Sequence, residues 1–238
     1  MRAPLASYTL EDQERMTKAK NYFAWQHRVV TKELGQRVIE VGCGIGNFTS
    51  LLLDREAVVA VDTEPGCVQR LQQRFPDRPN LRAVNCDVAA PEFSALRSFR
   101  ADTCVCLNVL EHIEDDCGAL RQMAEVLAPG GVAILLVAAS PSLYGPIDER
   151  LGHHRRYTHA SMLRIAEQAG FSVKTCHYVN AIGFFGWWIN SHILKRTAQS
   201  VAQIEFFDRY IVPMVSRIER YLHPPFGQSL FAVLKKSV

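Results

Sequence analysis

Apolar and β-branched residues occur in short runs along the chain, and segments with helical spacing of apolar residues separate these runs. The runs predict buried strands over residues 38–40, 57–61, 81–85, 102–107 and 132–138. Strands that alternate with helices are typical of a doubly wound parallel sheet, so the predicted fold class is α/β. A ligand of such a sheet is expected at the edge where the carboxyl ends of the strands meet.

The segments between the strands predict helices over 48–53, 68–75, 117–127 and 159–168. The Pro-Gly-Gly sequence at 129–131 predicts a helix stop and a turn before the fifth strand. Two more strands are predicted over 171–178 and 229–234. The helices and strands together account for most of one large domain.

Apolar residues with rough helical spacing flank this core on both sides. Residues up to about 31 predict a helix that either packs on the core or forms a lid, which would bring Tyr22 or Trp25 near a ligand. Residues 180–227 include Trp187 and predict a helix over 201–222, interrupted by Pro213. We divide the single domain, 1–238, into a helical lid (1–35), a ligand-binding core (36–179), a helical insertion (180–227) and the last strand (228–238).

Composition excludes several classes of protein. The net charge is only +3 and the basic residues are scattered rather than gathered into one stripe, so the charge argues neither for nor against a nucleic-acid partner. Seven cysteines without a C-x-x-C pair indicate neither a disulfide framework nor a zinc site, and we expect no metal and a reducing cytoplasm. The N-terminus has no signal-peptide pattern, and no apolar run reaches the ~20 residues of a membrane span.

The strongest motif is the sequence Val-Ile-Glu-Val-Gly-Cys-Gly-Ile-Gly-Asn at 38–47. Gly42, Gly44 and Gly46 alternate after a buried strand, and glycine lets a ligand lie against the backbone. A dinucleotide fingerprint needs G-x-G-x-x-G, whereas this loop reads E-x-G-x-G-x-G. Because Glu40 would repel a pyrophosphate, the loop suits a cationic ligand.

This acid and glycine arrangement resembles the first motif of class I S-adenosylmethionine (SAM) methyltransferases. The sequence Asp-Glu-Arg-Leu-Gly-His-His-Arg-Arg-Tyr at 148–157 resembles a signature of a bacterial subgroup called type 11 or 12. The resemblance implies a mostly parallel, seven-stranded Rossmann-like sheet with its last strand antiparallel. It also implies SAM as cofactor, S-adenosylhomocysteine (SAH) as product, and cofactor contacts from Glu40, Gly42, Cys43, Gly44 and Gly46.

Further cofactor residues are expected where the next strands end. Asp62 follows the second strand, where a carboxylate can accept hydrogen bonds from both ribose hydroxyls, with Thr63 beside it. The resemblance assigns Asp87 and Val88 to the adenine, and places Asn108 and Val109 at the methionine end. Helix capping is the alternative role for Asp62 and Asp87.

Acceptor and catalytic residues are expected after the fourth strand and in the loop 140–157. His112 is the first candidate for a general base, followed by His153 and His154. The alternative for His112 is a loop histidine bonded to the backbone, and a carboxylic acid acceptor would need no base. The acceptor residues that we expect are Tyr22, Trp25, Arg155, Arg156, Tyr157 and Trp187.

The resemblance therefore predicts methyl transfer to an oxygen or nitrogen of a small, hydrophobic or lipid-like acceptor. The Asn/Asp-Pro-Pro-aromatic tetrapeptide of base-directed relatives is missing after the fourth strand, which argues against a nucleic-acid substrate. The insertion either packs in the core or a homodimer, lines an apolar acceptor pocket, or contacts a membrane surface. Alternative functions are methylation of a protein or peptide, and a catalytically silent SAM-binding assembly partner.

Overall fold

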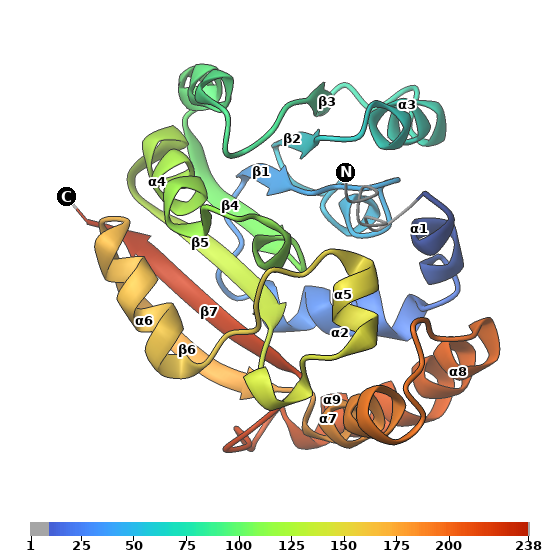
Figure 1. Cartoon of the computed structure of the whole chain (residues 1–238). Coiled ribbons are helices and arrows are strands. Elements are labelled where there is room, and N and C mark those ends of the chain that lie inside the picture. The colour runs from blue at the N-terminus through green and yellow to red at the C-terminus, as the bar shows by residue number, and fades with distance from the viewer. Residues whose placement is uncertain (1–9, 238) are drawn as a thin grey trace, which may run out of the picture.

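The computed structural model describes residues 10–237 and consists of one seven-stranded sheet with helices on both faces (Figure 1). Its strand order is β3-β2-β1-β4-β5-β7-β6, with β7 antiparallel to both of its neighbours and the other pairs parallel. This confirms the predicted α/β class and the antiparallel last strand. The strands are β1 (Arg37–Val41), β2 (Ala57–Asp62), β3 (Leu81–Asn85), β4 (Ala101–Leu107), β5 (Leu127–Ala138), β6 (Phe171–Val179) and β7 (Ser229–Lys236).

Helices connect and flank these strands. The α-helices are α1 (Leu10–Met16), α2 (Lys20–Val30), α3 (Pro65–Arg74), α4 (Asp116–Val126), α5 (Pro146–Leu151), α6 (His159–Gln168), α7 (Ala181–Trp188), α8 (Val201–Phe206) and α9 (Val212–Ile218). In the described part of the chain, no helix is long and apolar enough to cross a membrane.

Three expected elements differ from the structure. The helix expected over 48–53 is only a 3₁₀ turn, Thr49–Leu51, because the chain must return to begin β2 at Ala57. The Pro-Gly-Gly turn lies inside β5, since Leu127 pairs with Ala101 beside a register shift. The helix expected over 201–222 is divided by a π-helical segment, Phe207–Ile211, and ends at Ile218.

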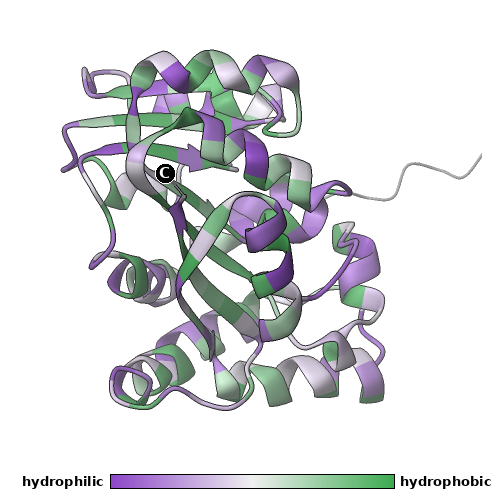
Figure 2. Cartoon of the chain, turned by 90° about the vertical axis from the view of Figure 1, so that its left-hand side faces the viewer, coloured by the Kyte–Doolittle hydropathy of each residue, from purple (hydrophilic) through white to green (hydrophobic). Residues whose placement is uncertain are grey.

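Side chains along each strand point alternately to the two faces of the sheet, and each face has its own hydrophobic core. On one face, Ile39 and Cys104 belong to the cluster that includes Leu120 and Met123 of α4. On the other face, Val38 and Val105 belong to the cluster that includes Trp25 of α2. Figure 2 shows the corresponding pattern, with hydrophobic central strands and helices that alternate between hydrophobic and hydrophilic residues. Both faces of the sheet are therefore covered, as a parallel sheet requires.

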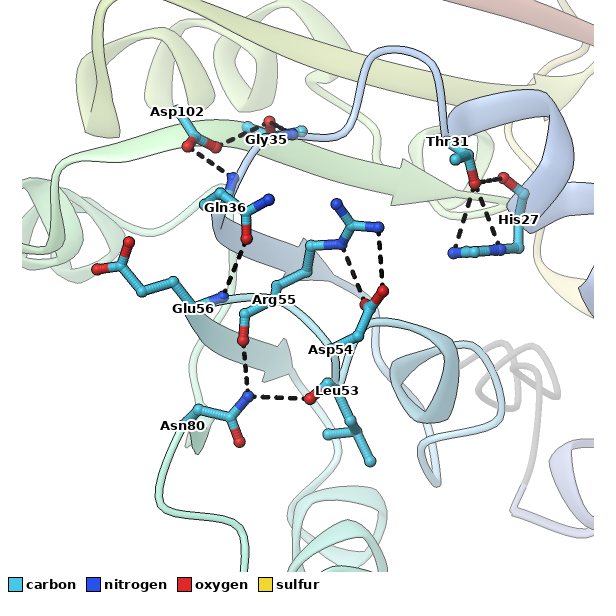
Figure 3. Close-up of polar contacts among 11 residues, drawn as sticks. His27, Thr31, Gly35, Gln36, Leu53, Asp54, Arg55, Glu56, Asn80 and Asp102 are labelled. Atoms are coloured by element: carbon cyan, nitrogen blue, oxygen red, sulfur yellow. Dashed lines mark hydrogen bonds and ion pairs between the residues drawn. The ribbon is translucent and has the colours of Figure 1, made fainter.

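Side chains also fasten the amino-terminal ends of neighbouring strands (Figure 3). Asp102 Oδ2 accepts hydrogen bonds from the backbone N–H groups of Gln36 (2.8 Å) and Arg37 (3.1 Å). Asn80 Nδ2 donates to the carbonyl groups of Leu53 and Arg55. These contacts lie at the end of the sheet opposite to the expected ligand, and they give β1, β2 and β4 a fixed relative position.

The amino-terminal helices and the helices between β6 and β7 pack together at the carboxyl end of the strands (Figure 1). Asp208 accepts hydrogen bonds from the backbone N–H groups of Asn21 (3.2 Å) and Tyr22 (2.7 Å). Arg150 of α5 forms an ion pair with Asp12 of α1 at 3.1 Å. Segments far apart in the sequence thus form one layer over this edge of the sheet.

Candidate functional site

A cavity of about 1180 Å³ lies between the carboxyl ends of the strands and this layer of helices. Its floor includes Glu40, Gly42 and Cys43 after β1, Asp62 after β2, and Asn108 after β4. Helices α1, α2, α5, α7 and α8 all contribute to its walls. The cavity is therefore at the position that a doubly wound sheet reserves for a ligand.

The glycine loop requires glycine for two physical reasons. Gly42, Gly44 and Gly46 have φ angles of 76°, 52° and 85°, in the left-handed region that favours glycine. A Cβ on Gly42 would meet Val109 Cγ2 at 2.2 Å. Backbone and neighbouring side chains are therefore in close contact around the loop, and Gly42 and Cys43 line the cavity directly.

Asp62 is bonded to the glycine loop as well as to its own turn. Its Oδ2 accepts a hydrogen bond from the Gly44 N–H (2.7 Å), and its Oδ1 accepts one from the Glu64 N–H (2.9 Å). Burial raises the pKa of Asp62, and these backbone hydrogen bonds lower it by less than burial raises it. Thr63 beside it also lines the cavity. The carboxylate is thus fixed in orientation at the cavity wall before any ligand binds.

Glu40 is a buried carboxyl group with unused hydrogen-bonding capacity. Its side chain is 4% exposed, and its Oε2 has no partner among the described residues. Burial raises the pKa of Glu40 to about 8. A buried acceptor without a partner is unfavourable, so this oxygen suits a donor or a cation bound in the cavity.

The remaining predicted cofactor residues also lie along the cavity. Asp87 and Val88 line it after β3, although Asp87 Oδ1 also accepts a hydrogen bond from the Ala89 N–H at 2.8 Å. Asn108 has a φ of 56°, and its backbone N–H donates to the Leu136 carbonyl at 2.7 Å. Tyr22 hydrogen-bonds Asn108, and burial raises the pKa of Tyr22 to about 12.

Two of the three predicted histidines line the cavity together. The rings of His112 and His153 have centroids 4.5 Å apart and meet edge to face at 86°. Burial lowers the pKa of His112 to about 4, so its imidazole is neutral near pH 7. His154 is exposed and does not line the cavity.

Other predicted acceptor residues are divided between the cavity and the protein interior. Arg156 and Trp187 line the cavity, with the Arg156 guanidinium 4.8 Å from the Trp187 ring centroid. Trp25 lies in the hydrophobic core, with its ring tilted by 33° to that of Tyr22, and does not line the cavity. Tyr157 is buried and donates to Asp116 Oδ2 at 2.8 Å, and Arg155 pairs with the same carboxylate at 2.6 Å. These bonds hold Tyr157 and Arg155 away from the cavity.

Two buried carboxyl groups complete the site: Glu111, which the sequence did not indicate, and Asp148, which the sequence indicated only as one of several titratable residues in the loop 140–157. Glu111 is 1% exposed, and burial raises its pKa. Asp148 is fully buried and hydrogen-bonds His153 Nδ1 (2.7 Å) and Arg156 Nε (2.8 Å). Glu111 lies in the segment after the fourth strand, and Asp148 is the first residue of the motif at 148–157. Nothing in the sequence shows that these two segments meet.

Comparison with known proteins gives the class of this chain. A family model described as a methyltransferase domain matches residues 10–175, and the chain belongs to this family. The chain is 29% identical over 166 residues to a probable S-adenosylmethionine-dependent methyltransferase of Mycolicibacterium smegmatis, a match that covers 65% of this chain and 61% of the relative.

Two further comparisons support the same class. The chain is 26% identical over 112 residues to the ubiquinone biosynthesis O-methyltransferase of Leptothrix cholodnii, which covers 47% of this chain and 48% of the relative. The matches thus span between about half and three fifths of these relatives. A methyltransferase solved in complex with the Haloferax volcanii Trm112 methyltransferase activator has the same fold, with a TM-score of 0.68, 16% identity and full coverage of both chains.

The cavity has the features that SAM, the cofactor of this class, requires. SAM carries a sulfonium and an ammonium group, and Glu40 offers a buried oxygen that has no partner in the part of the chain that the structure describes. The left-handed loop at Gly42 to Gly46 leaves backbone exposed to a ligand, and Asp62 has a fixed orientation next to it. The residues present therefore fit this cofactor.

Proposed function

We propose that this chain transfers a methyl group from SAM to an oxygen or nitrogen atom of a small apolar acceptor. The observation that carries the proposal is one continuous cavity that joins the carboxylate-flanked glycine loop to an apolar compartment. Glu40 would face the ammonium group, Asp62 the ribose, and Asp87 and Val88 the adenine. The apolar compartment is lined by Ile147, Leu151, Trp187, Phe206, Phe207 and Ile211.

The outer surface of the helices between β6 and β7 supports an apolar acceptor. Phe185 and Trp188 of α7 are 55% and 42% exposed, and Phe206 of α8 is 59% exposed while it also lines the cavity. A concentration of exposed apolar side chains is typical of a surface that receives a hydrophobic ligand, a membrane or a partner. Phe206 belongs both to this surface and to the cavity lining, so an apolar molecule that binds outside would meet the cavity at this residue.

Methyl transfer in such a site depends mainly on alignment. The acceptor atom must approach the methyl carbon from the side opposite the sulfur, and the enclosing helices exclude water from this position. The new bond to the acceptor forms as the carbon–sulfur bond breaks, and the electron pair stays on the sulfur. The chain's own contribution is to bind both molecules and to receive or release the acceptor's proton.

Incubation with methyl-labelled SAM and an acceptor panel tests the proposal. The panel contains alkyl phenols, alkyl catechols, alkyl amines and a mixture of peptides. We expect label in the organic extract with an apolar phenol, catechol or amine. Label confined to peptides would establish the protein-methylating alternative instead. SAH binding without any labelled product would favour a silent SAM-binding module.

Replacing His112 with alanine should lower turnover more than it lowers SAH affinity. The neutral imidazole can accept a proton, but its low pKa makes it a weak base, so we expect a loss near the lower end for general bases, about 100-fold in kcat. SAH affinity, measured by isothermal titration calorimetry, should change much less. The control is His159→Ala, which removes an exposed histidine outside the cavity. Unchanged kcat in His112→Ala would exclude this residue as the base.

Replacing Glu40 with glutamine should remove a proton release that accompanies SAH binding. With a pKa of about 8, the Glu40 carboxyl group is mostly protonated at pH 7, and the ligand's ammonium group would lower that pKa and expel the proton. Calorimetry at pH 7 in two buffers of different ionisation enthalpy measures the number of protons released. We expect nearly one proton fewer in Glu40→Gln than in the wild type. Equal release in both proteins would contradict the assignment of Glu40 to the ammonium group.

A further inference from the structure

We propose that Glu111, His112 and His153 form a binding site for a divalent transition-metal ion, and that Zn²⁺ is the ion that this site fits. One ligand atom from each residue lies within 4.8 Å of the others, and all three residues line the cavity. Glu111 and His112 follow β4, whereas His153 follows α5. The site therefore exists only where these two segments meet.

Glu111 supplies a carboxylate oxygen that has no partner among residues 10–237. Its Oε1 accepts a hydrogen bond from the Ala138 N–H at 3.1 Å, which fixes the side chain against the end of β5. Its Oε2 is buried and has no hydrogen-bond partner among the described residues. A buried carboxylate oxygen of this kind is costly unless a cation or a donor compensates it.

His153 is oriented as metal-binding histidines usually are. Its Nδ1 is 2.7 Å from Asp148 Oδ1, so Nε2 is the ring nitrogen that remains to bind a metal ion. Asp148 is itself fully buried and is bonded to Arg156 Nε, which limits its movement. A carboxylate that bonds the second nitrogen of a histidine fixes the tautomer and makes the first nitrogen a better ligand.

Backbone hydrogen bonds hold the two segments of the site together. The His154 N–H donates to the Glu111 carbonyl at 2.8 Å, and the Tyr144 hydroxyl donates to the His153 carbonyl at 2.9 Å. The His153 N–H donates to the Asp148 carbonyl at 2.9 Å. The position of His153 relative to Glu111 is therefore fixed by the fold.

His112 supplies the third ligand atom of the site. It hydrogen-bonds the Leu151 backbone, and its ring meets that of His153 at a centroid distance of 4.5 Å. Tetrahedral coordination with bonds of 2.0–2.1 Å places ligand atoms about 3.3 Å apart, so atoms that now lie within 4.8 Å of one another need to approach by up to about 1.5 Å. Because the Ala138 N–H holds Glu111, we assign this approach to His112, which is less buried than Glu111 and His153.

The charges around the site also favour a cation. Asp148 carries one negative charge, and the buried Arg156 guanidinium compensates it through a contact of 2.8 Å. Glu111 places a further carboxyl group beside this pair, with a buried oxygen that has no partner among the described residues. A divalent ion bound to Glu111 would compensate the negative charge of this carboxylate.

The donor set indicates the kind of metal and its role. Two imidazole nitrogens and one carboxylate oxygen are the ligands of catalytic zinc sites, which keep a fourth position open. Here the fourth position would face the cavity, where a hydroxyl oxygen of the acceptor could occupy it. With the ion bound, His112 is a ligand rather than the base. Coordination lowers the pKa of the acceptor hydroxyl, so its proton passes to water before the oxygen attacks the methyl carbon. This role rests on the proposed function, whereas the binding of the metal does not.

Metal binding can be measured without any acceptor. The purified protein is stripped with a chelator and titrated with Zn²⁺ by calorimetry, and with Co²⁺ by visible absorption, which reports tetrahedral coordination. We expect about one ion per chain in the wild type. Glu111→Gln and His153→Asn should each weaken Zn²⁺ binding at least 100-fold, because each removes a ligand atom while it keeps the neighbouring hydrogen bond. His159→Ala is the matched control and should bind Zn²⁺ like the wild type.

SAH affinity of the same variants separates the two proposals. A variant that binds SAH normally but has lost Zn²⁺ is folded, and it supports the metal site. The metal site would be overturned if the wild type failed to bind Zn²⁺ and Co²⁺, or if both variants bound Zn²⁺ as tightly as the wild type does. Either result would leave the methyltransferase proposal intact. Loss of SAH binding in the wild type would overturn the methyltransferase proposal alone.

Discussion

Asp62→Ala should weaken SAH binding by about 10- to 100-fold. A hydrogen bond to a charged group contributes about 1.5–3 kcal/mol, and Asp62 is placed to accept from the ribose at the end of β2. The substitution also removes the acceptor of the Gly44 N–H, which Asp62 Oδ2 holds at 2.7 Å, so the glycine loop loses a support. Calorimetry with SAH measures the change directly. Asp54→Ala, which removes an exposed carboxylate of the same charge, is the matched control.

An analogue of SAH without the 2′-hydroxyl group separates the two effects of this substitution. The wild type should bind SAH more tightly than the analogue, because only SAH offers the hydroxyl. If Asp62 contacts the ribose, Asp62→Ala should bind both compounds about equally. If the variant still prefers SAH by the wild-type factor, Asp62 acts on the loop and the ribose assignment is wrong.

The part of the cavity around the glycine loop, which we propose binds the cofactor, follows from the sequence because local patterns determine it. Buried β-branched runs predict parallel strands, and the residues directly after such strands must meet at one edge. Gly42 and Gly44 have the left-handed φ angles that alternating glycines indicate, and Asp62 and Asp87 line the cavity as expected. No knowledge of distant contacts is needed for these positions.

The acceptor half could not be predicted in the same way because distant segments build it. Tyr157 and Arg155 carry the chemistry expected of a binding loop, yet both bond Asp116 at the start of α4. Trp25 has the spacing of a lid residue, but the face of α2 that carries it packs against the sheet. Glu111 and His153 meet because the His154 N–H bonds the Glu111 carbonyl, a contact between residues 43 positions apart. Sequence periodicity contains no signal for such a contact.

The helices between β6 and β7 show a second reason for this limit. Their sequence is apolar on several sides, and the expected single helix over 201–222 is interrupted by the π-helical segment Phe207–Ile211. Asp208 in this segment accepts the backbone N–H groups of Asn21 and Tyr22, so a tertiary contact coincides with the wider helical turn. Helical propensity alone does not predict this geometry, because the partner comes from α2.

Asp148→Ala should destabilise the fold more than any other single substitution considered for this site. The fully buried carboxylate accepts hydrogen bonds from Arg156 Nε (2.8 Å), Trp187 Nε1 (3.3 Å) and the Gly145 N–H (3.1 Å), in addition to its contact with His153. Its removal leaves the Arg156 guanidinium buried without its counter-charge, which costs about 3–5 kcal/mol. For a chain of this length the melting temperature should fall by about 6–20 °C. Differential scanning calorimetry measures the shift.

The pH dependence of this shift identifies its cause. Burial alone would raise the pKa of Asp148, but the hydrogen bond from His153 and the charge of Arg156 outweigh it and hold that pKa below its usual value. The stabilisation is therefore present above the unfolded-state pKa of about 4 and is lost as the pH falls through the lower folded-state value. The difference in melting temperature between wild type and Asp148→Ala should accordingly be full at neutral pH and shrink at strongly acidic pH.

Two further variants distinguish loss of charge pairing from loss of packing. Glu149→Ala removes the adjacent exposed carboxylate of α5 and should change the unfolding free energy by no more than about 0.5 kcal/mol. Adding Arg156→Met to Asp148→Ala should restore part of the lost stability, because the uncompensated charge is then gone. If the double variant is less stable than Asp148→Ala by the full cost of a second core substitution, packing rather than charge pairing explains the effect.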